Sequence, residues 1–502
     1  MMIEILADAA PIALSPPVIV AVLFGVVLGV TVGAVPGISG DMAMALLLPF
    51  VFTMDTAPAI GMLMGVYKGS LFGGSVSAIM FGVPGTPGAA ATILDGFPAK
   101  KAGMPNRALH TGLYSSVFGD FSAVMVLIFI ATPLALLALK FGPREFFALY
   151  VVSIIVIASL DRGRVALGFA SAAVGILLSM VGRDPFSGAP RYAFGSTDLA
   201  GGLALVPVLI GLFAVSEIML QVGRTWKHRL QDENRRIEEA AAAEGYDISK
   251  DRLSFREYRG LWRAVVTGAA TGTVVGALPG AGATLAGFLS YGLTKRFSKQ
   301  PERFGKGALE GIAAPEAGNS ATAGATLIPL FAFGIPGSGS AALIGAAFIM
   351  QGISPGPQMI ESNMVIIYAV FGLLLYGSLF TLVTSKLLLP YYARISMLQP
   401  RYVLPVVLGL ALLGTYATDN SIFDVWVLIG AGMLGVVMRV AGMPIAPVAL
   451  GFILGPGLER SLRQSLILGF NEMSYFFQSV IAASIYIVAL VVLVLFAWVT
   501  RK

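Results

Sequence analysis

The sequence predicts an all-α polytopic membrane protein, with about 10–12 spanning helices plus two re-entrant hairpins, built from two inverted repeats with Gly/Pro-broken helices. Three observations predict this fold class. The 502-residue chain is 57% hydrophobic and only 12% charged. Apolar runs long enough to span a bilayer recur along it, and two patterns of glycine and proline each occur twice. A soluble core does not need so many segments that are apolar on every face.

The duplicated patterns lie inside apolar sequence. The first, GVVLGVTVGAVPGISG at 25–40, returns as GAATGTVVGALPGAGA at 268–283. The second, FGVPGTPGAAA at 81–91, returns as FGIPGSGSAAL at 333–343. Proline removes a backbone donor and glycine permits turns that other residues resist, so each copy has two breaks. In a membrane protein, broken helices at matching places of two halves indicate a substrate site near mid-membrane.

A polar segment divides the chain into two halves. We interpret 1–223 as a first membrane repeat, 224–263 as a charged cytoplasmic connector and 264–502 as a second membrane repeat. A solvated linker is favoured over a regulatory or partner-binding role for the connector. The expected spans of the two halves are 111–139, 145–160, 165–182 and 199–220, then 363–389, 402–418, 425–441 and 475–499.

The charges around the duplicated breaks predict opposite orientations for the two copies. Arg259 and Arg263 precede the second hairpin, and basic residues also occupy 295–306 after it. Its arms of about 12–16 residues are short for a span, so we expect the hairpin to enter from the cytoplasm and return there. The flanks of the first copy carry acids such as Glu4 and Asp55 instead. We therefore expect its ends to face outward.

The composition argues against several other functions. The chain has no cysteine, and its two histidines, His110 and His228, lie far apart, which disfavours a metal site. It contains no Walker loop and no GxSxG motif. Its net charge of +6 comes from basic residues between apolar runs, as the positive-inside rule expects in a lipid bilayer. We therefore expect no catalytic residues and no nucleic-acid partner.

The residues at the breaks are the candidate binding groups. Helix N-termini offer free N–H groups and a positive dipole end, which suit a carboxylate, whereas unwound carbonyls suit a cation. At the Pro-Gly breaks, which we call the tips, the alternative to a binding role is a helix kink without further function. For Asn319 and Ser320 the alternative is hydrogen bonding between helices. The candidate substrate-binding residues are Pro36, Gly37, Ser39, Gly85, Thr86, Gly280, Gly282, Thr284, Gly337, Ser338, Lys68, Asn319 and Ser320, and the candidate ion-coupling residues are Asp41 and Ser340.

Three charged residues stand in apolar surroundings: Asp41, Lys68 and Glu316. Ionisable groups inside a membrane are functional hypotheses by default. Asp41 is expected to bind a cation or a proton, and Lys68 to attract an anion or pair with an acid. Glu316 follows Pro315, where a helix cap is a competing interpretation. Snorkelling or ion pairing is the alternative for all three.

These segments resemble the large membrane subunit of the tripartite tricarboxylate transporters. The matching stretches cover most of the chain and are VGAVPGISG, YKGSLFGGSVSAIMFGVPGTPGAAATILDGFP, LPGAGATLAGFLSYGL, FGKGALEGIAAPEAGNSATAGATLIPLFAFGIPGSGS and QGISPGPQ. The resemblance implies a secondary transporter subunit of the bacterial inner membrane, driven by an ion gradient of Na⁺ or H⁺ and without other cofactors. It further implies three partners, namely a small four-helix-type membrane subunit, a periplasmic solute-binding protein and the organic carboxylate that this protein delivers.

The chain also departs from the family pattern near the inferred site. Similar proteins often have a second tyrosine where Lys68 stands, paired asparagines at Asn319 and Ser320, and a small or apolar residue at Asp41. The substrate therefore stays open among tricarboxylates, dicarboxylates and aromatic acids, and a homodimer of the complex also stays open. An ion channel is the alternative function, because paired re-entrant loops also build pores.

Overall fold

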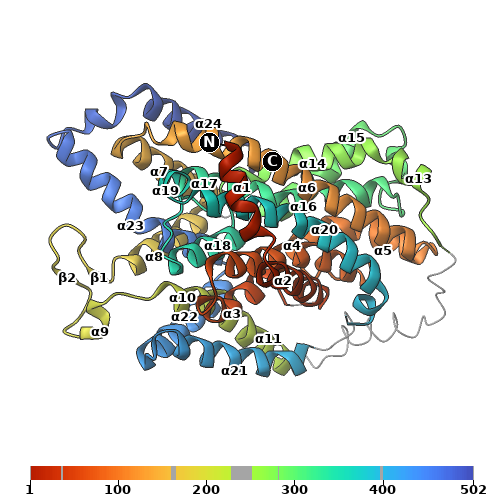
Figure 1. Cartoon of the computed structure of the whole chain (residues 1–502), viewed down its shortest axis with the longest axis horizontal. Helices are drawn as coiled ribbons and strands as arrows, with labels where there is room; N and C mark the ends of the chain where they lie inside the picture. Colours follow the sequence, from red (N-terminus) through yellow and green to blue (C-terminus); the bar gives the residue numbers. More distant parts are fainter. Residues whose placement is uncertain are drawn as a thin grey trace.

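The computed structural model describes residues 2–35, 38–159, 165–227, 251–280, 282–395 and 400–500 (Figure 1). Within these ranges the chain is almost entirely helical, and its strands are one short antiparallel pair, β1 (Gly182–Arg183) and β2 (Pro190–Arg191). Six described helices are long and apolar enough to cross a membrane, and five shorter apolar helices accompany them. The predicted all-α polytopic fold class is confirmed.

The helices of each half follow one another with short connections. The first half contains α1 (Met2–Ala13), α2 (Pro16–Ala34), α3 (Gly40–Phe52), α4 (Thr56–Phe81), η1 (Pro87–Thr92), α5 (Ile93–Lys101), α6 (Pro105–Ala138), α7 (Pro143–Ser159), α8 (Val165–Ser179), α9 (Thr197–Ala200), α10 (Leu205–Ile210), η2 (Gly211–Val215) and α11 (Ser216–Lys227). The second half contains α13 (Phe255–Gly260), α14 (Trp262–Gly276), α15 (Gly282–Phe297), η3 (Pro301–Arg303), α16 (Glu310–Ala325), α17 (Leu327–Phe333), α18 (Gly339–Met350), α19 (Pro357–Ser362), α20 (Met364–Ile395), α21 (Pro400–Asp419), α22 (Ile422–Val440), α23 (Ile445–Leu468), η4 (Met473–Phe477) and α24 (Val480–Thr500).

The expected spans all overlap helices, but one helix was missed and one arm departs from the predicted re-entrant hairpin. The helix α23 was not predicted, because Pro456 and two later arginines interrupt its apolar run. In the second hairpin the arms α14 and α15 have 15 and 16 residues, as expected. In the first copy α2 has 19 residues and is long enough to span a membrane, although a re-entrant hairpin was predicted there.

The helices end at the duplicated breaks. The break between α2 and α3 includes Pro36 and Gly37, which lie outside the described residues. At the second break, α4 and α17 both end in a left-handed residue, Gly82 with φ of 69° and Gly334 with φ of 74°. Glycine takes this conformation without a steric penalty and commonly ends helices in this way. The repeated FG dipeptide therefore places the same stop signal in both halves.

Glycine rows bring equivalent helix pairs into backbone contact. A Cβ atom added to Gly29 of α2 would lie 2.4 Å from the carbonyl oxygen of Val66 in α4. A Cβ added to Gly272 of α14 would lie 2.2 Å from the carbonyl oxygen of Gly318 in α16. Small residues permit this close approach between helices in membranes. Matching contacts therefore occur in both copies, while their inverted orientation in a membrane stays a prediction.

The two halves interlock instead of forming separate lobes. The helix α6 of the first half packs on α16 of the second, and α20 of the second half packs on α2 and α4 of the first. Likewise α8 packs on α23, and α22 packs on α10, η2 and α11. The boundaries at 223 and 264 stay predictions from the sequence, and only residues 224–227 and 251–263 of the connector lie within the described ranges.

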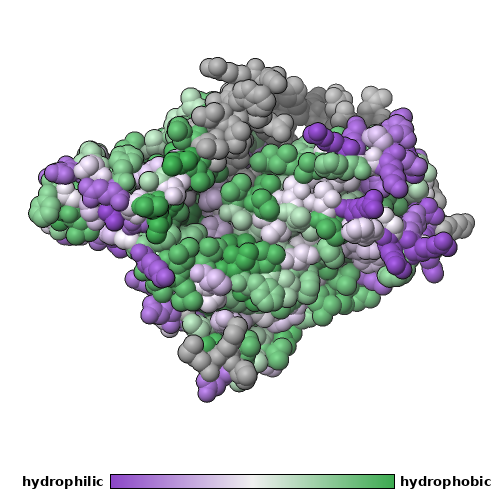
Figure 2. All heavy atoms as spheres, turned by 90° about the horizontal axis from the view of Figure 1, so that it is seen from above, coloured by the Kyte–Doolittle hydropathy of each residue, from purple (hydrophilic) through white to green (hydrophobic). Residues whose placement is uncertain are grey.

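On the face seen in Figure 2, hydrophilic residues gather mainly toward the two ends of the long axis, and most of the surface between them is hydrophobic. The helices α5, α13 and α15 lie toward one end, and β1, β2 and α9 lie at the other (Figure 1). At the first end Asp95 joins the halves, because its Oδ1 accepts hydrogen bonds from the amides of Gly305, Gly307 and Ala308 at 2.9, 2.8 and 2.8 Å. Asp95 of α5 is thus held against the end of the segment 295–306, which was expected on the cytoplasmic side, and against the residues that follow it.

Candidate functional site

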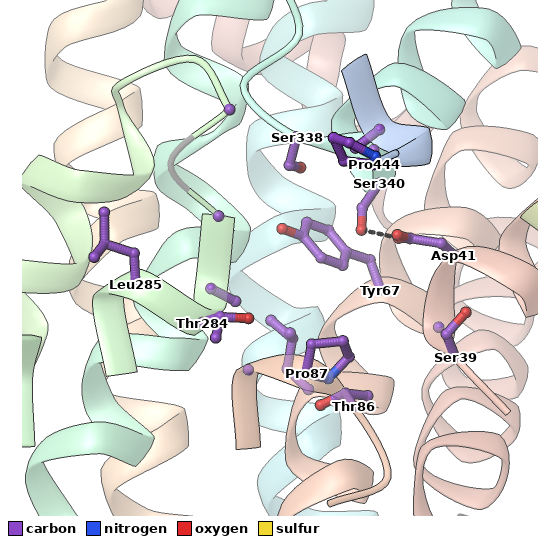
Figure 3. Close-up of a pocket in the computed structure, with 18 of the residues that line it drawn as sticks. Ser39, Asp41, Tyr67, Thr86, Pro87, Thr284, Leu285, Ser338, Ser340 and Pro444 are labelled. Atoms are coloured by element: carbon purple, nitrogen blue, oxygen red, sulfur yellow. Dashed lines mark hydrogen bonds between the residues drawn. The ribbon is translucent and has the colours of Figure 1, made fainter. Parts of the chain in front are cut away.

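A cavity of about 620 Å³ lies where the broken helices of the two halves meet. Every described break contributes to its wall, and α7 and α23 close it (Figure 3). The predicted residues that line this cavity are Ser39, Asp41, Thr86, Gly280, Gly282, Thr284, Ser338 and Ser340. The structure therefore brings together residues that are separated by up to about 300 positions in the chain.

Three helices begin at the wall of this cavity. The first residues of α3, α15 and α18 are Gly40, Gly282 and Gly339, and all three line it. Ser39 and Ser338 precede α3 and α18, and each hydroxyl accepts a hydrogen bond from the amide three residues later at 3.1 Å. The first amides of a helix have no partner within it and carry its positive dipole end. The cavity wall is therefore suited to an anion.

Asp41 of α3 and Ser340 of α18 meet across the two halves, because the Ser340 hydroxyl donates a hydrogen bond to Asp41 Oδ1 (Figure 3). Asp41 is the only charged side chain among the described residues that line the cavity. Carboxylate and hydroxyl oxygens are ligands that suit a hard cation, and a carboxyl group can also carry a proton. The pair thus provides one acidic position in a wall otherwise suited to an anion.

Other polar side chains complete the wall. Tyr67 of α4 lines the cavity, and its hydroxyl lies 3.4 Å from Thr326 Oγ1. Thr86 also lines it, and Thr86 Oγ1 has no hydrogen-bond partner among the described residues. Tyr67 was not predicted, although the repeat pattern contained a signal. With FGVPG aligned on FGIPG, Tyr67 corresponds to Asn319, which was a candidate.

Lys68, which was expected to attract an anion or to pair with an acid, does not line the cavity. It is 4% exposed, and its Nζ lies 2.9 and 2.7 Å from the two carboxylate oxygens of Asp120 in α6. It also donates to the carbonyl oxygen of Leu374 at 2.8 Å and to Ser378 Oγ at 3.0 Å. Of the two roles expected for Lys68, the structure has the pairing with an acid. Asp120 was missed, although a lone acid in the apolar run 105–138 is a signal.

Glu316 lies inside α16 and does not cap a helix, so the capping interpretation is wrong. Its carboxylate is fully buried and accepts hydrogen bonds from Ser75 at 2.6 Å, from Ser116 at 2.9 Å and from Thr92. These three hydroxyls come from α4, α6 and η1 of the first half. Glu316 is therefore another polar junction between the halves, outside the cavity wall.

The remaining candidates lie close to the cavity without lining it. Asn319 is buried, its Nδ2 is 3.5 Å from the carbonyl oxygen of Leu71, and its Oδ1 has no partner among the described residues. Ser320 borders a small void beside Lys68. Gly85 and Gly337 are architectural, since their amides donate to the carbonyl oxygens of Gly74 at 3.1 Å and Thr326 at 3.3 Å, respectively. These are equivalent bonds in the two copies.

Comparisons with known proteins show the family to which the chain belongs. The family described as "Tripartite tricarboxylate transporter TctA family" matches residues 19–450. An uncharacterised 52.8 kDa protein in the TAR-I ttuC′ 3′ region of Agrobacterium vitis is 37% identical over 483 residues, which cover 96% of this chain and 94% of that protein. An uncharacterised protein in the TAR-II ttuC′ 3′ region of the same organism is 38% identical over 224 residues, covering 45% of this chain and 93% of its own length. No solved structure matches the chain. The chain is therefore a multi-pass membrane protein that belongs to the tripartite tricarboxylate transporter TctA family.

Proposed function

We propose that this chain forms the translocation path of an ion-coupled secondary transporter that imports organic carboxylates across the bacterial inner membrane. One observation carries the proposal, namely that all the described breaks line a single cavity whose only described charged residue is Asp41. Membership in the TctA family agrees with a transporter subunit. A cavity of about 620 Å³ has room for a substrate with several carboxylates.

The substrate carboxylates would bind to backbone and hydroxyl groups. No described lysine or arginine lines the cavity, so the positive potential there has to come from the starts of α3, α15 and α18. Three separate helix starts suit a ligand with two or three carboxylates better than one with a single carboxylate. Backbone amides are also used in this way in other secondary transporters with broken helices.

Asp41 supplies the reason for ion coupling. Two carboxylates about 6 Å apart repel each other by roughly 3 kcal/mol at an effective dielectric constant of about 20. A substrate anion would therefore bind poorly beside an ionised Asp41. A sodium ion or a proton at Asp41 and Ser340 would remove the repulsion, so ion and substrate would bind favourably only together. This mutual dependence is what couples the two in a symporter.

Uptake into proteoliposomes tests the proposal. We expect this chain, together with its small membrane subunit and periplasmic binding protein, to take up a labelled carboxylate saturably, and to stop when an ionophore removes the ion gradient. The chain alone should show negligible uptake. Flux that neither saturates nor needs the binding protein and the gradient would instead identify a channel.

A further inference from the structure

A second cavity, of about 900 Å³, lies at the base of the α14–α15 hairpin. It is formed by the start of α14, the end of α15, the segment 298–310 and the start of α6. It shares no described lining residue with the first cavity. The helices α13 and α15 place it toward the end of the molecule where hydrophilic side chains cluster, on the right in Figures 1 and 2.

The polar wall of this cavity is basic. Four cations line it, Arg107, Arg263, Lys299 and Arg303, against two acids, Glu257 and Glu310. Arg107 is paired with Asp251 at 2.8 Å and with Glu257 at 3.5 Å. Among the residues that the structure describes, no carboxylate lies within ion-pair distance of the other three cations. Three basic side chains therefore surround the cavity without an acidic partner.

The same wall holds two further hydrogen-bond donors, the buried Thr294 and the exposed Arg263. Thr294 is 7% exposed, and its hydroxyl has no hydrogen-bond partner within the described ranges. Arg263 lies over the Trp262 ring, with 5.6 Å between the guanidinium carbon and the ring centre. A phosphate oxygen is a strong acceptor for a hydroxyl and for guanidinium groups. The wall therefore offers a hydroxyl and a guanidinium group as hydrogen-bond donors to a phosphate group.

Apolar ridges lead away from the basic wall along both helices. On α14 exposed apolar residues recur every four positions, at Trp262, Val266, Ala270 and Val274, and the exposed Leu278 follows just after the end of the helix. On α15 the exposed row is Leu289, Leu293 and Phe297. Residues four apart lie on one face of a helix. An exposed tryptophan beside basic residues is typical of the membrane–water interface.

We propose that this cavity binds the phosphate headgroup of an anionic phospholipid, whose acyl chains lie along the exposed faces of α14 and α15. The basic wall, the Thr294 hydroxyl and the adjoining apolar ridges match the two parts of such a molecule. Basic cavities between helices on the cytoplasmic side are known binding places for anionic headgroups. The tip of this hairpin carries Gly280 and Gly282, so the lipid would anchor the base of an element that lines the first cavity.

Native mass spectrometry of the complete chain in neutral detergent tests the site. The chain is titrated with phosphatidylglycerol, with phosphatidylcholine of the same chain length and with inorganic phosphate. The test variant is Lys299→Gln with Arg303→Gln. The matched control is Lys295→Gln with Arg296→Gln, which removes the same two charges from the same region, and neither control residue lines the cavity.

We expect one saturable phosphatidylglycerol site, at least tenfold weaker phosphatidylcholine binding, and about 30-fold weaker phosphatidylglycerol binding in the test variant, since each basic residue contributes about 1 kcal/mol. The control and the wild type should agree. Arg263→Gln should weaken binding in the same direction. Equal binding of both lipids, or an equal loss in the control, would overturn the proposal. Displacement by inorganic phosphate at comparable concentration would also overturn it, by assigning the cavity to a soluble anion.

Discussion

The amide nitrogen of Gly280 donates a hydrogen bond to the carbonyl oxygen of Gly337, with an N–O distance of 2.7 Å. The two glycines belong to different breaks of the second half, so this bond ties its two tips directly together. Both are packed tightly, because a Cβ atom on Gly280 would lie 2.6 Å from Ile157 Cγ1 and one on Gly337 would lie 2.9 Å from Thr326 Cα. Substitutions at these glycines would therefore disturb the fold, and side chains in the cavity give cleaner tests of function.

We expect Asp41→Asn to abolish the ion dependence of uptake. Asparagine keeps the size and a hydrogen-bond acceptor for Ser340 but cannot bind a proton or balance a cation charge. Uptake under an ion gradient should fall at least tenfold, while exchange of substrate without a gradient should persist. The two rates are compared in proteoliposomes.

The control for this substitution is Asp55→Asn. Asp55 precedes α4, is exposed and makes no side-chain cap bond, so this variant should transport as the wild type does. Unchanged ion dependence in Asp41→Asn would remove Asp41 from the coupling mechanism.

The pair of Lys68 and Asp120 should matter for stability. Removal of one member of a buried ion pair leaves an uncompensated charge and costs about 3–5 kcal/mol. Lys68→Met alone should therefore lower the thermal unfolding temperature of the detergent-solubilised protein strongly. Lys68→Met combined with Asp120→Leu should recover much of the loss. If the single variant is as stable as the wild type, the pair is not a structural element.

Close helix packing predicts that alanine substitutions at two glycines have different effects on the stability of the protein. Gly272→Ala would place a Cβ 2.2 Å from the carbonyl oxygen of Gly318, so α14 and α16 would have to separate, at about 1–3 kcal/mol. Gly292→Ala in α15 meets nothing within 4 Å and should be neutral or up to about 1 kcal/mol stabilising. Thermal unfolding measures both. Equal effects would show that the row of glycines is not needed for close approach.

The orientation of the two copies can be measured with single cysteines, since the chain has none of its own. Gln300 and Asp55 are both exposed, and they follow the hairpin arms of the second and the first copy, respectively, in opposite charge environments. We expect Gln300→Cys to react with an impermeant maleimide only after permeabilisation of the cells. Asp55→Cys should react from outside in intact cells. Labelling of both from the same side would contradict the inverted topology.

The sequence predicted the tips better than it predicted the charges between them. Four predicted residues at the breaks line the cavity, namely Ser39, Thr86, Thr284 and Ser338. They could be predicted because a glycine and proline break is a local signal, visible in neighbouring residues of the sequence. The partner of Lys68 is another matter, since Asp120 lies 52 positions away and a single sequence does not indicate which acid it meets. For the same reason the hydroxyls around Glu316, on three other elements, could not be foreseen.

The contacts between the two halves also have a consequence for the synthesis of the chain. A Cβ on Gly119 of α6 would lie 2.1 Å from the carbonyl oxygen of Ala317 in α16, so α6 is shaped to receive a helix that is translated much later. At about 5–20 residues per second, the roughly 200 residues between these helices take about 10–40 s to synthesise. During that interval the Glu316 carboxylate, which accepts hydrogen bonds from Ser75, Thr92 and Ser116 in the finished structure, has not yet been synthesised. The first half therefore lacks these contacts with α16 until the second half has been synthesised.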